Sequence, residues 1–322
     1  MLGKLGAHRP ETLVPASLGV DAAVVAADGD QWAWVLTSDP ITTAVSGAGR
    51  LAVHVVCNDL AAMGAEPVGV LATLLFPQGA SASEVATITA DIDLTARALH
   101  VEVLGGHTEV APGLSAPLVV MTGVGKARRD RILTASGARP GDALVLTKAA
   151  ALEGTHVLAN DLAAHLRSRG VAEDVVEAAR LYADELSVVP EARVAAEFGA
   201  TAMHDPTEAG VIGALWEMAE ASGCGFRVRA SRIAVREPTR IICDALGVDP
   251  LRLIASGALL IACRDVEALL RVLQEHGVAA AQIGQMTSAE HGRVLIHDDG
   301  RQENVSQLER DELYRVLEQQ KV

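Results

Sequence analysis

Strand-length and helix-length apolar segments alternate along this chain, and the alternation begins again after the Arg-Pro-Gly-Asp segment at 139–142. Apolar runs bounded by turn residues predict strands at 20–29, 31–39, 68–77 (a buried strand closed by a proline), 101–104, 116–125, 143–148, 225–228, 258–263 and 293–297. Helical spacing predicts helices at 49–64, 81–100, 154–168, 174–182, 187–198, 207–222, 239–246 and 266–276. The order lacks the regular cadence of a doubly wound sheet, so we expect two mixed domains, α/β plus α+β, at residues 1–138 and 139–322.

The charge of the chain argues against nucleic acid as a partner. It has 41 Asp and Glu against 27 Lys and Arg, a formal net charge of −14, whereas phosphate backbones are bound by clustered cations. With two Tyr and three Phe, it also lacks aromatic platforms on which bases could stack. An acidic protein still binds anionic ligands when a divalent metal mediates.

The termini and the cysteines predict a cytoplasmic protein with no membrane partner. The segment MLGKLGAHRPE has no apolar signal-peptide core, and no uninterrupted apolar run reaches the length of a membrane span. The four cysteines, Cys57, Cys224, Cys243 and Cys263, are scattered among apolar residues without a Cys-x-x-Cys pair. We expect buried free thiols rather than a zinc or redox site.

Several common nucleotide and hydrolase motifs are missing from the sequence. No Walker A sequence occurs, no Gly-x-Gly-x-x-Gly opens a helix after the first strand, and no Gly-x-Ser-x-Gly elbow is present. The sequence therefore does not favour a P-loop protein, a Rossmann dehydrogenase or an α/β-hydrolase.

Four aspartates stand where strands end or apolar helices begin: Asp21, Asp39, Asp59 and Asp205. Asp59 lies among Val, Leu, Ala and Met in a helical segment, and a carboxylate there needs a partner. Taken singly, each aspartate is more often a cap or turn residue. Taken together, converging carboxylates would repel one another, and Mg²⁺ with nucleotide phosphates would relieve that repulsion.

The Gly-Gly-His-Thr-Glu-Val segment at 105–110 follows a predicted strand. Gly105 and Gly106 predict either an ordinary turn or a backbone that a phosphate can approach closely. His107 and His204 are the candidate catalytic histidines, and a structural hydrogen bond explains each equally well.

The ordered series VDAAVV, TSDP, NDLAAMGAEP, GGHTEV and HDPTEAG resembles the superfamily of aminoimidazole ribonucleotide (AIR) synthetase. The later segments SGCGFRV, IAVREPTR and LGVDPLRLIASGALLIA are similar to its HypE branch. The resemblance runs from about Leu2 to about His297 and implies a two-domain AIR-synthetase-like (PurM-like) fold. The N-terminal domain would bind ATP and dimerise through its sheet into a barrel, and the C-terminal domain would be α+β.

The resemblance also implies the site residues, carried over motif by motif. Four aspartates match the metal and phosphate positions: Asp21, Asp39, Asp59 and Asp205. The residues expected near the nucleotide are Asn58, Gly105, Gly106, His107, Thr108 and Thr207. The cofactors implied are ATP and Mg²⁺, and the expected assembly is a homodimer.

The sequence departs from the family pattern at four places. HypE proteins end in a cysteine tail, whereas this chain ends LEQQKV and has no cysteine after Cys263, so we expect no such chemistry on its own tail. The family's Asn-Glu-Gly reads Ala255-Ser256-Gly257, and Val20 replaces a second carboxylate in the first motif. Gly-Gly-His resembles selenophosphate synthetase, whose N-terminal catalytic cysteine or selenocysteine has no counterpart here.

The expected function is a Mg-ATP-dependent enzyme that phosphorylates the oxygen of an unidentified small-molecule or protein acceptor and releases ADP. Two alternatives remain open from the sequence. One is an ATP-binding maturation or assembly factor without turnover. The other is a small-metabolite kinase that resembles thiamine-monophosphate kinase.

Overall fold

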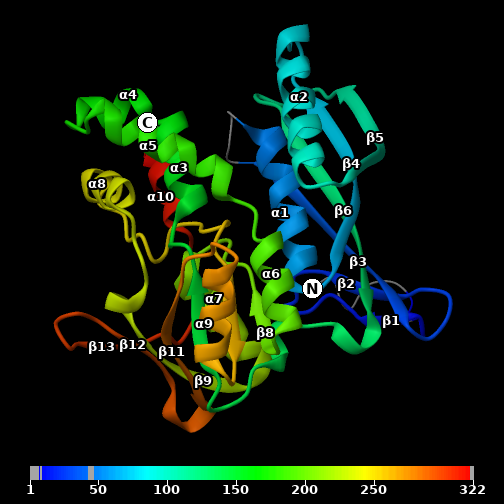
Figure 1. Ribbon diagram of the computed structural model, residues 1–322. Helices are drawn as coiled ribbons and strands as arrows, with labels where there is room; N and C mark the ends of the chain where they lie inside the picture. Colours follow the sequence, from blue (N-terminus) through cyan, green and yellow to red (C-terminus); the bar gives the residue numbers. More distant parts are fainter. Residues whose placement is uncertain (1–6, 8, 43–46, 320–322) are drawn as a thin grey trace. The chain divides into compact units, whose positions relative to one another are not determined.

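The computed structural model describes residues 7, 9–42 and 47–319, and the chain forms two compact units (Figure 1). The first unit runs to residue 132 without 17–21 and 62–64, and those two short segments belong with residues 133–322 in the second unit. Within the described residues, no helix is both long and apolar enough to span a membrane.

The first unit is built on a six-stranded sheet of order β1-β2-β3-β6-β4-β5. Its elements are β1 (Thr12–Val14), β2 (Ala23–Ala26), β3 (Trp32–Ile41), α1 (Ala48–Ala62), β4 (Glu66–Phe76), α2 (Ala82–Ala98), β5 (Glu102–Val110), β6 (Leu118–Arg128) and a 3-10 turn at Arg129–Arg131. β3 and β6 pair antiparallel over ten residue pairs, and β4 pairs parallel with the edge strand β5. The predicted helix at 49–64 and the predicted strands of this region are confirmed with small shifts at their ends, except that the strand predicted at 101–104 runs on to Val110.

Helix α1 lies in the core of the first unit because its sequence is apolar on nearly every side. Gly123 and Gly125 of β6 face it, and a Cβ on either glycine would stand 3.0–3.2 Å from the side chains of Val56 or Leu60. The glycines therefore let the helix approach the sheet closely. This packing buries Asn58 and Asp59, the two polar residues of the helix that the sequence singled out.

Helix α2 begins with the predicted capping box. The Ser81 side chain accepts a hydrogen bond from the Glu84 backbone, and the Glu84 carboxylate accepts one from Ser81 N–H at 2.7 Å. The turn offered as one alternative for Gly105 and Gly106 is wrong, because strand β5 continues through residues 105–110. The predicted burial of β4 holds for one face only: Val70, Leu74 and Phe76 are buried, whereas Val68 and Leu71 are 40% exposed.

The second unit contains a seven-stranded sheet of order β13-β12-β9-β11-β7-β10-β8, in which β12 and β9 pair parallel and the other described neighbours pair antiparallel. Its strands are β7 (Ala143–Thr147), β8 (Ala200–His204), β9 (Cys224–Arg229), β10 (Leu260–Cys263), β11 (Ala280–Ser288), β12 (Arg293–Ile296) and β13 (Gln302–Asn304). Its helices are α3 (Leu152–Asp161), α4 (Ala163–Ser168), α5 (Glu173–Arg180), α6 (Val189–Glu197), α7 (Gly210–Ser222), α8 (Glu237–Leu246), α9 (Val266–Glu275) and α10 (Glu312–Gln319). Short 3-10 turns lie at Ala135–Gly137, Leu181–Glu185, Ala230–Arg232 and Ala289–His291.

Helix α7 packs on one face of this sheet, where Leu215 and Met218 join Phe226, Ile283 and Leu295 in a continuous apolar core. On the other face, α9 packs against β11 and α6 packs against β8. All four cysteines of the chain are free and buried, as the sequence predicted.

Several elements of the second unit differ from the sequence prediction. The helix predicted at 154–168 is two helices, α3 and α4, and α10 was not predicted. β8, β11 and β13 were not predicted, because their alanines, glycines and glutamines give no clear period-two apolar pattern. The helix predicted from 207 begins at Gly210, because Ala209 is left-handed with φ of 60° and stops the helix from extending backwards.

Candidate functional site

The predicted site residues lie in both units, and each group is described within its own unit. The first unit carries Asp39, Asn58, Asp59, Gly105, Gly106, His107 and Thr108. The second unit carries Asp21, His204, Asp205 and Thr207.

In the first unit, a hydroxyl group brings Asp39 and Asp59 together. Thr37 Oγ1 shares its hydrogen between Asp59 Oδ2 at 2.6 Å and Asp39 Oδ2 at 3.0 Å. Thr37 and Asp39 are two apart on β3 and so lie on the same face of the strand, while Asp59 comes from the buried helix α1. The sequence singled out both aspartates but not Thr37, because the role of Thr37 depends on how β3 packs on α1.

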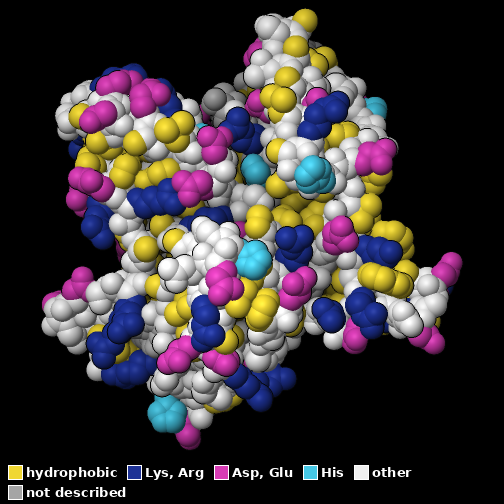
Figure 2. Space-filling model, in the orientation of Figure 1, with side chains coloured by type: hydrophobic (Ala, Val, Ile, Leu, Met, Phe, Trp, Pro, Cys, Tyr) yellow, Lys and Arg dark blue, Asp and Glu magenta, His cyan; other side chains and the backbone are white. Residues whose placement is uncertain are grey.

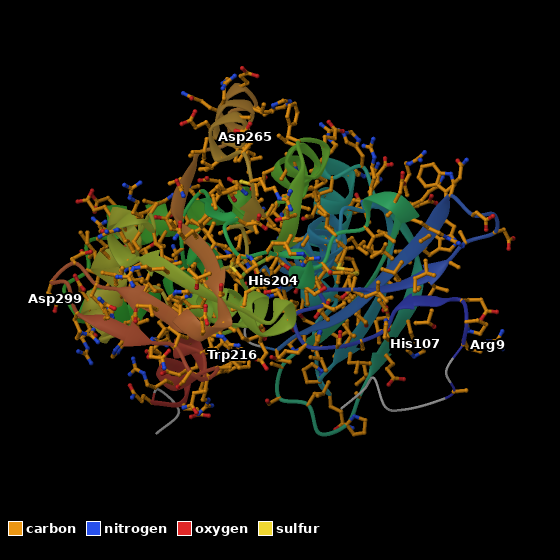
Figure 3. All side chains as sticks on the ribbon, turned by 90° about the horizontal axis from the view of Figure 1, so that it is seen from below. Arg9, His107, His204, Trp216, Asp265 and Asp299 are labelled. Atoms are coloured by element: carbon orange, nitrogen blue, oxygen red, sulfur yellow. The ribbon has the colours of Figure 1, made fainter. Side chains whose placement is uncertain are left out.

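The four residues from Gly105 to Thr108 lie on β5 and line a pocket of about 410 Å³. Thr89 and Asp93 of α2 form part of the same pocket. The His107 ring is largely exposed, and its Nε2 lies 3.1 Å from the Glu109 carboxylate. Figure 3 shows His107 at the edge of the first unit.

Glycine is required at this place by the backbone. Val70 of β4 pairs with Val103, but Leu71 pairs with Gly105, so Leu104 is an extra residue that forms a bulge. Gly105 and Gly106 have φ of 152° and 153°, and a Cβ on Gly106 would overlap the carbonyl oxygen of Ala72. The paired glycines therefore serve a strand bulge, which the sequence alone could not distinguish from a turn.

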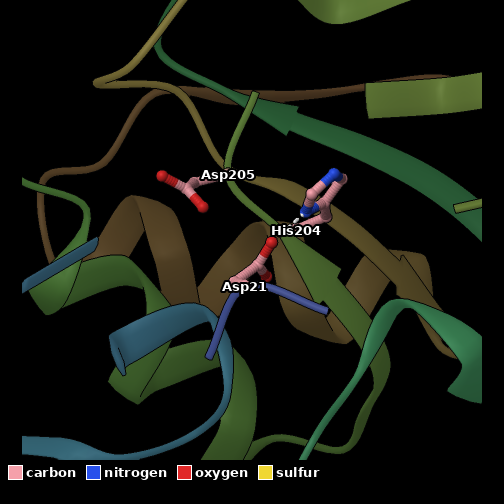
Figure 4. A group of neighbouring side chains, drawn as sticks. All are labelled: Asp21, His204 and Asp205. Atoms are coloured by element: carbon pink, nitrogen blue, oxygen red, sulfur yellow. Dashed lines mark hydrogen bonds and ion pairs between the residues drawn. The ribbon is translucent and has the colours of Figure 1, made fainter. Parts of the chain in front are cut away.

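In the second unit, Asp21, His204 and Asp205 form a compact group (Figure 4). One ligand atom from each residue lies within 4.8 Å of the others. His204 ends β8 and Asp205 follows it directly, so the two come from the edge strand of the sheet.

Asp21 reaches this group from the short segment 17–21. Gly19, with φ of 68°, lies against α7, where a Cβ would stand 3.0 Å from Ala221 Cβ and 3.1 Å from the Glu217 carbonyl oxygen. A small residue with positive φ therefore holds the segment against the helix just before the aspartate.

The His204 ring is hydrogen-bonded on both sides. Its Nδ1 lies 2.5 Å from Asp21 Oδ1, and its Nε2 lies 2.9 Å from Glu217 Oε2 of α7. Burial alone would lower the pKa of His204, but the charges and hydrogen bonds of Asp21 and Glu217 outweigh it and raise the pKa well above 6.5. The ring is therefore an imidazolium that donates to both carboxylates. Glu217 was missed, because it is a single acidic residue on an apolar helix.

This group was tested for its fit to a divalent cation. Mg²⁺ takes oxygen ligands and keeps water or phosphate oxygens for the rest of its shell. The carboxylates of Asp21 and Asp205 fit that preference, whereas both nitrogens of His204 are already engaged as donors. The residues present fit Mg²⁺ as a two-carboxylate site in which His204 orients Asp21 rather than acting as a ligand.

A second buried acidic group was not predicted from the sequence. Glu153 lies in the first turn of α3 and is 3% exposed, and burial raises its pKa to about 7. Ser256, from the Ala-Ser-Gly segment that departs from the family pattern, lies beside it and is also buried. Burial raises the pKa of Asp311 to about 6, although that side chain accepts hydrogen bonds from Ala209 N–H and Leu313 N–H.

Comparisons with known proteins assign both parts of the chain to one family. The model for the N-terminal domain of AIR synthase related proteins matches residues 19–127, and the model for the C-terminal domain matches residues 139–297. A protein of Methanocaldococcus jannaschii, named a hydrogenase expression/formation protein, is 31% identical over 269 residues, which cover 81% of this chain and 76% of that protein. Carbamoyl dehydratase HypE of Azotobacter vinelandii is 32% identical over 249 residues, covering 76% of this chain and 70% of that protein.

A solved structure agrees with these sequence matches. The hydrogenase maturation protein HypE in complex with ATP superposes with a TM-score of 0.71 and 27% identity, over 91% of this chain and 89% of that chain. The resemblance drawn from the motifs and the two-domain PurM-like fold are thereby confirmed. The chain belongs to the AIR synthase-related family and, within it, resembles the HypE-type hydrogenase maturation proteins.

Proposed function

We propose that this protein is a Mg²⁺-ATP-dependent enzyme that transfers the γ-phosphoryl group of ATP to an acceptor oxygen and releases ADP. The observation that carries the proposal is the buried group of Asp21, His204 and Asp205, which fits a cation. It is supported by similarity to carbamoyl dehydratases and to a HypE structure that holds ATP.

In this proposal, Asp21 and Asp205 hold the cation, and His204 keeps Asp21 oriented through their 2.5 Å hydrogen bond. The bound Mg²⁺ would supply positive charge against the phosphate oxygens. Asp39 and Asp59, which Thr37 bridges, are proposed as the carboxylates of the first unit that act on the metal and the phosphates. Asn58, the glycines of β5, Thr108 and Thr207 are proposed as neighbours of the nucleotide.

His107 and His204 have different proposed roles because their surroundings differ. His107 is exposed and has one carboxylate neighbour, so we propose that it meets the acceptor and transfers a proton. His204 is buried between two carboxylates, and we propose that it acts by positioning Asp21.

We also propose that the protein is a homodimer formed through the sheet of the first unit. β5 is an edge strand, and exposed apolar side chains lie on it and on its neighbour β4: Val68, Leu71, Val103, Leu104 and Val110. An edge with such side chains is suited to pairing with a second copy. Sedimentation of the protein and of a Leu104→Lys variant measures this directly, and a dimer in both would contradict the assignment.

One observation favours an alternative, an assembly factor that binds ATP without turnover. Ser256 stands where the family pattern has a glutamate, and it is buried rather than presented to solvent. If ATP binds in a Mg²⁺-dependent manner but no ADP forms with any acceptor tested, this alternative replaces the enzyme.

The proposal is tested by titrating ATP calorimetrically into the protein with and without Mg²⁺. We expect Asp59→Asn and Asp205→Asn to weaken Mg²⁺-dependent ATP binding by about 100-fold or more, since each removes a carboxylate that is proposed to act on the metal. Asp299→Asn, a change at an exposed turn residue (labelled in Figure 3), controls for the loss of one negative charge. Unchanged ATP affinity in both site variants would refute the assignment.

A further inference from the structure

The seven-stranded sheet of the second unit carries an open pocket on the face opposite α7. Along β9, Phe226 and Val228 point into the core, so the alternating Arg227 and Arg229 point to the other face. Helices α6 and α9 pack on that face against β8 and β11, and β9 and β12 extend beyond them.

Three arginines meet in a pocket of about 280 Å³ on this region, which we call the arginine pocket. It is lined by Arg227, Arg229, Arg232, Gln282, Ile283, Gly284, Gln285 and Ile296. Cross-strand pairing sets Gln285 of β11 directly opposite Arg227, and Ile296 of β12 beside Arg229. Arg232 enters from the 3-10 turn that follows β9. Figure 2 shows Lys and Arg side chains gathered at the lower left, over the part of the sheet where Figure 1 labels β11 to β13.

The arginine pocket has no carboxylate in its lining, although acidic residues exceed basic ones by 41 to 27 in this chain. Other arginines of the second unit pair with acids: Arg252 lies 3.0 Å from Glu309, and Arg236 lies 2.6 Å from Glu185. In the part of the chain that the structure describes, the side chains of Arg227, Arg229 and Arg232 have neither an ion pair nor a hydrogen bond to another residue. Three like charges therefore share one pocket, and no described carboxylate is paired with any of them.

We propose that the arginine pocket binds a small phosphate-bearing anion. Guanidinium groups present paired N–H donors that match the oxygens of a phosphoryl group, and they stay charged at every physiological pH. The glutamine side chains add neutral polar groups, and the pocket is concave, which suits a small ligand better than a flat protein surface. None of the residues assigned to the metal and nucleotide lines this pocket, so the proposal does not rest on the proposed function.

The test is calorimetric titration of the full chain with inorganic phosphate and, in a second arm, with glycerol 3-phosphate, which separates a free phosphate from a monoester. We expect binding of at least one of the two, weakened about tenfold or more by each of R227Q, R229Q and R232Q. The triple variant R227Q/R229Q/R232Q is expected to lose it.

A matched control has the same change of charge elsewhere in the second unit. R193Q/R240Q/R271Q replaces three exposed arginines that do not line the pocket, and we expect it to bind phosphate as the natural chain does. Equal phosphate affinity in the two triple variants would overturn the proposal, as would absence of binding of both probes at millimolar concentration. A parallel loss of ATP affinity in R227Q/R229Q/R232Q would also overturn it, because the pocket would then not be a separate site.

Discussion

Replacing Glu153 by glutamine is expected to stabilise the second unit, and to do so only above acidic pH. Glu153 is buried at the start of α3, and burial raises its pKa from 4.5 to about 7. The charges of Glu208 and Asp311 act in the same direction, and the neighbouring Ser256 offsets only part of the rise. Glutamine has nearly the shape of the protonated acid, so it keeps the packing and removes the ionisation.

The sign and size of the effect follow from proton binding. Between pH 4.5 and about 7 the folded protein holds a proton on Glu153 that the unfolded chain has released, so the free energy of unfolding falls as pH rises through that window. At 1.36 kcal/mol for each pH unit, the full difference is about 3 kcal/mol. We therefore expect Glu153→Gln to match the natural chain near pH 4.5 and to be more stable by about 3 kcal/mol at pH 8.

Tryptophan fluorescence can report on the second unit alone. Trp216 is its only tryptophan, so replacing the partly exposed Trp32 and Trp34 of the first unit by phenylalanine leaves one reporter. Urea unfolding of this reporter chain, with and without Glu153→Gln, is measured between pH 4.5 and 8. Glu275→Gln on the exposed side of α9 is the matched control.

Two results would refute this reasoning. A stability difference that is the same at pH 5 and pH 8 would show that ionisation of Glu153 is not the cause. A glutamine variant less stable at pH 8 would mean that the carboxylate makes a favourable interaction that outweighs its burial.

Two further substitutions test the packing of each unit. Gly106→Ala is expected to lower the free energy of unfolding of the first unit by about 3 kcal/mol or more, because the new Cβ would overlap the Ala72 carbonyl. The control Gly113→Ala has free space around its Cβ and should cost only about 1 kcal/mol, for its positive φ. Urea unfolding followed by Trp32 and Trp34 in a Trp216→Phe chain measures both, and equal losses would contradict the steric reasoning. Lys148→Met is expected to lower the free energy of unfolding of the second unit by about 3–5 kcal/mol, since Lys148 Nζ lies 2.7 Å from the buried Glu191 carboxylate, which would lose its partner. Urea unfolding of the Trp216 reporter chain measures this loss, and adding Glu191→Gln should recover part of it.

The elements that could be predicted are those whose signal is local. α1 is apolar at most of its positions, and α2 carries its start signal in Ser81 and Glu84, so both were found close to their true ends. β8 and β11 have no such signal, and they are strands because their backbones pair with β10, β7 and β9. Strand pairing of this kind depends on residues far away in sequence.

The candidate site shows the same limit. The aspartates could be singled out because a carboxylate in an apolar segment is unusual, but their partners could not. Thr37 meets Asp59 across 22 residues, and His204 meets Asp21 across 183. The arginine pocket likewise depends on the register that sets Gln285 opposite Arg227.

These partners change the electrostatic reasoning that led to a metal. Converging carboxylates were expected to need a cation, yet in the second unit the protein supplies one: protonated His204 lies between Asp21 and Glu217. In the first unit, the group that bridges Asp39 and Asp59 is instead a neutral hydroxyl, that of Thr37. A metal-nucleotide complex would therefore gain more from the first-unit pair than from Asp21, whose charge is already partly offset. It follows that Asp59→Asn should weaken Mg²⁺-dependent ATP binding more than Asp21→Asn does, and the reverse order would show that His204 does not compensate Asp21.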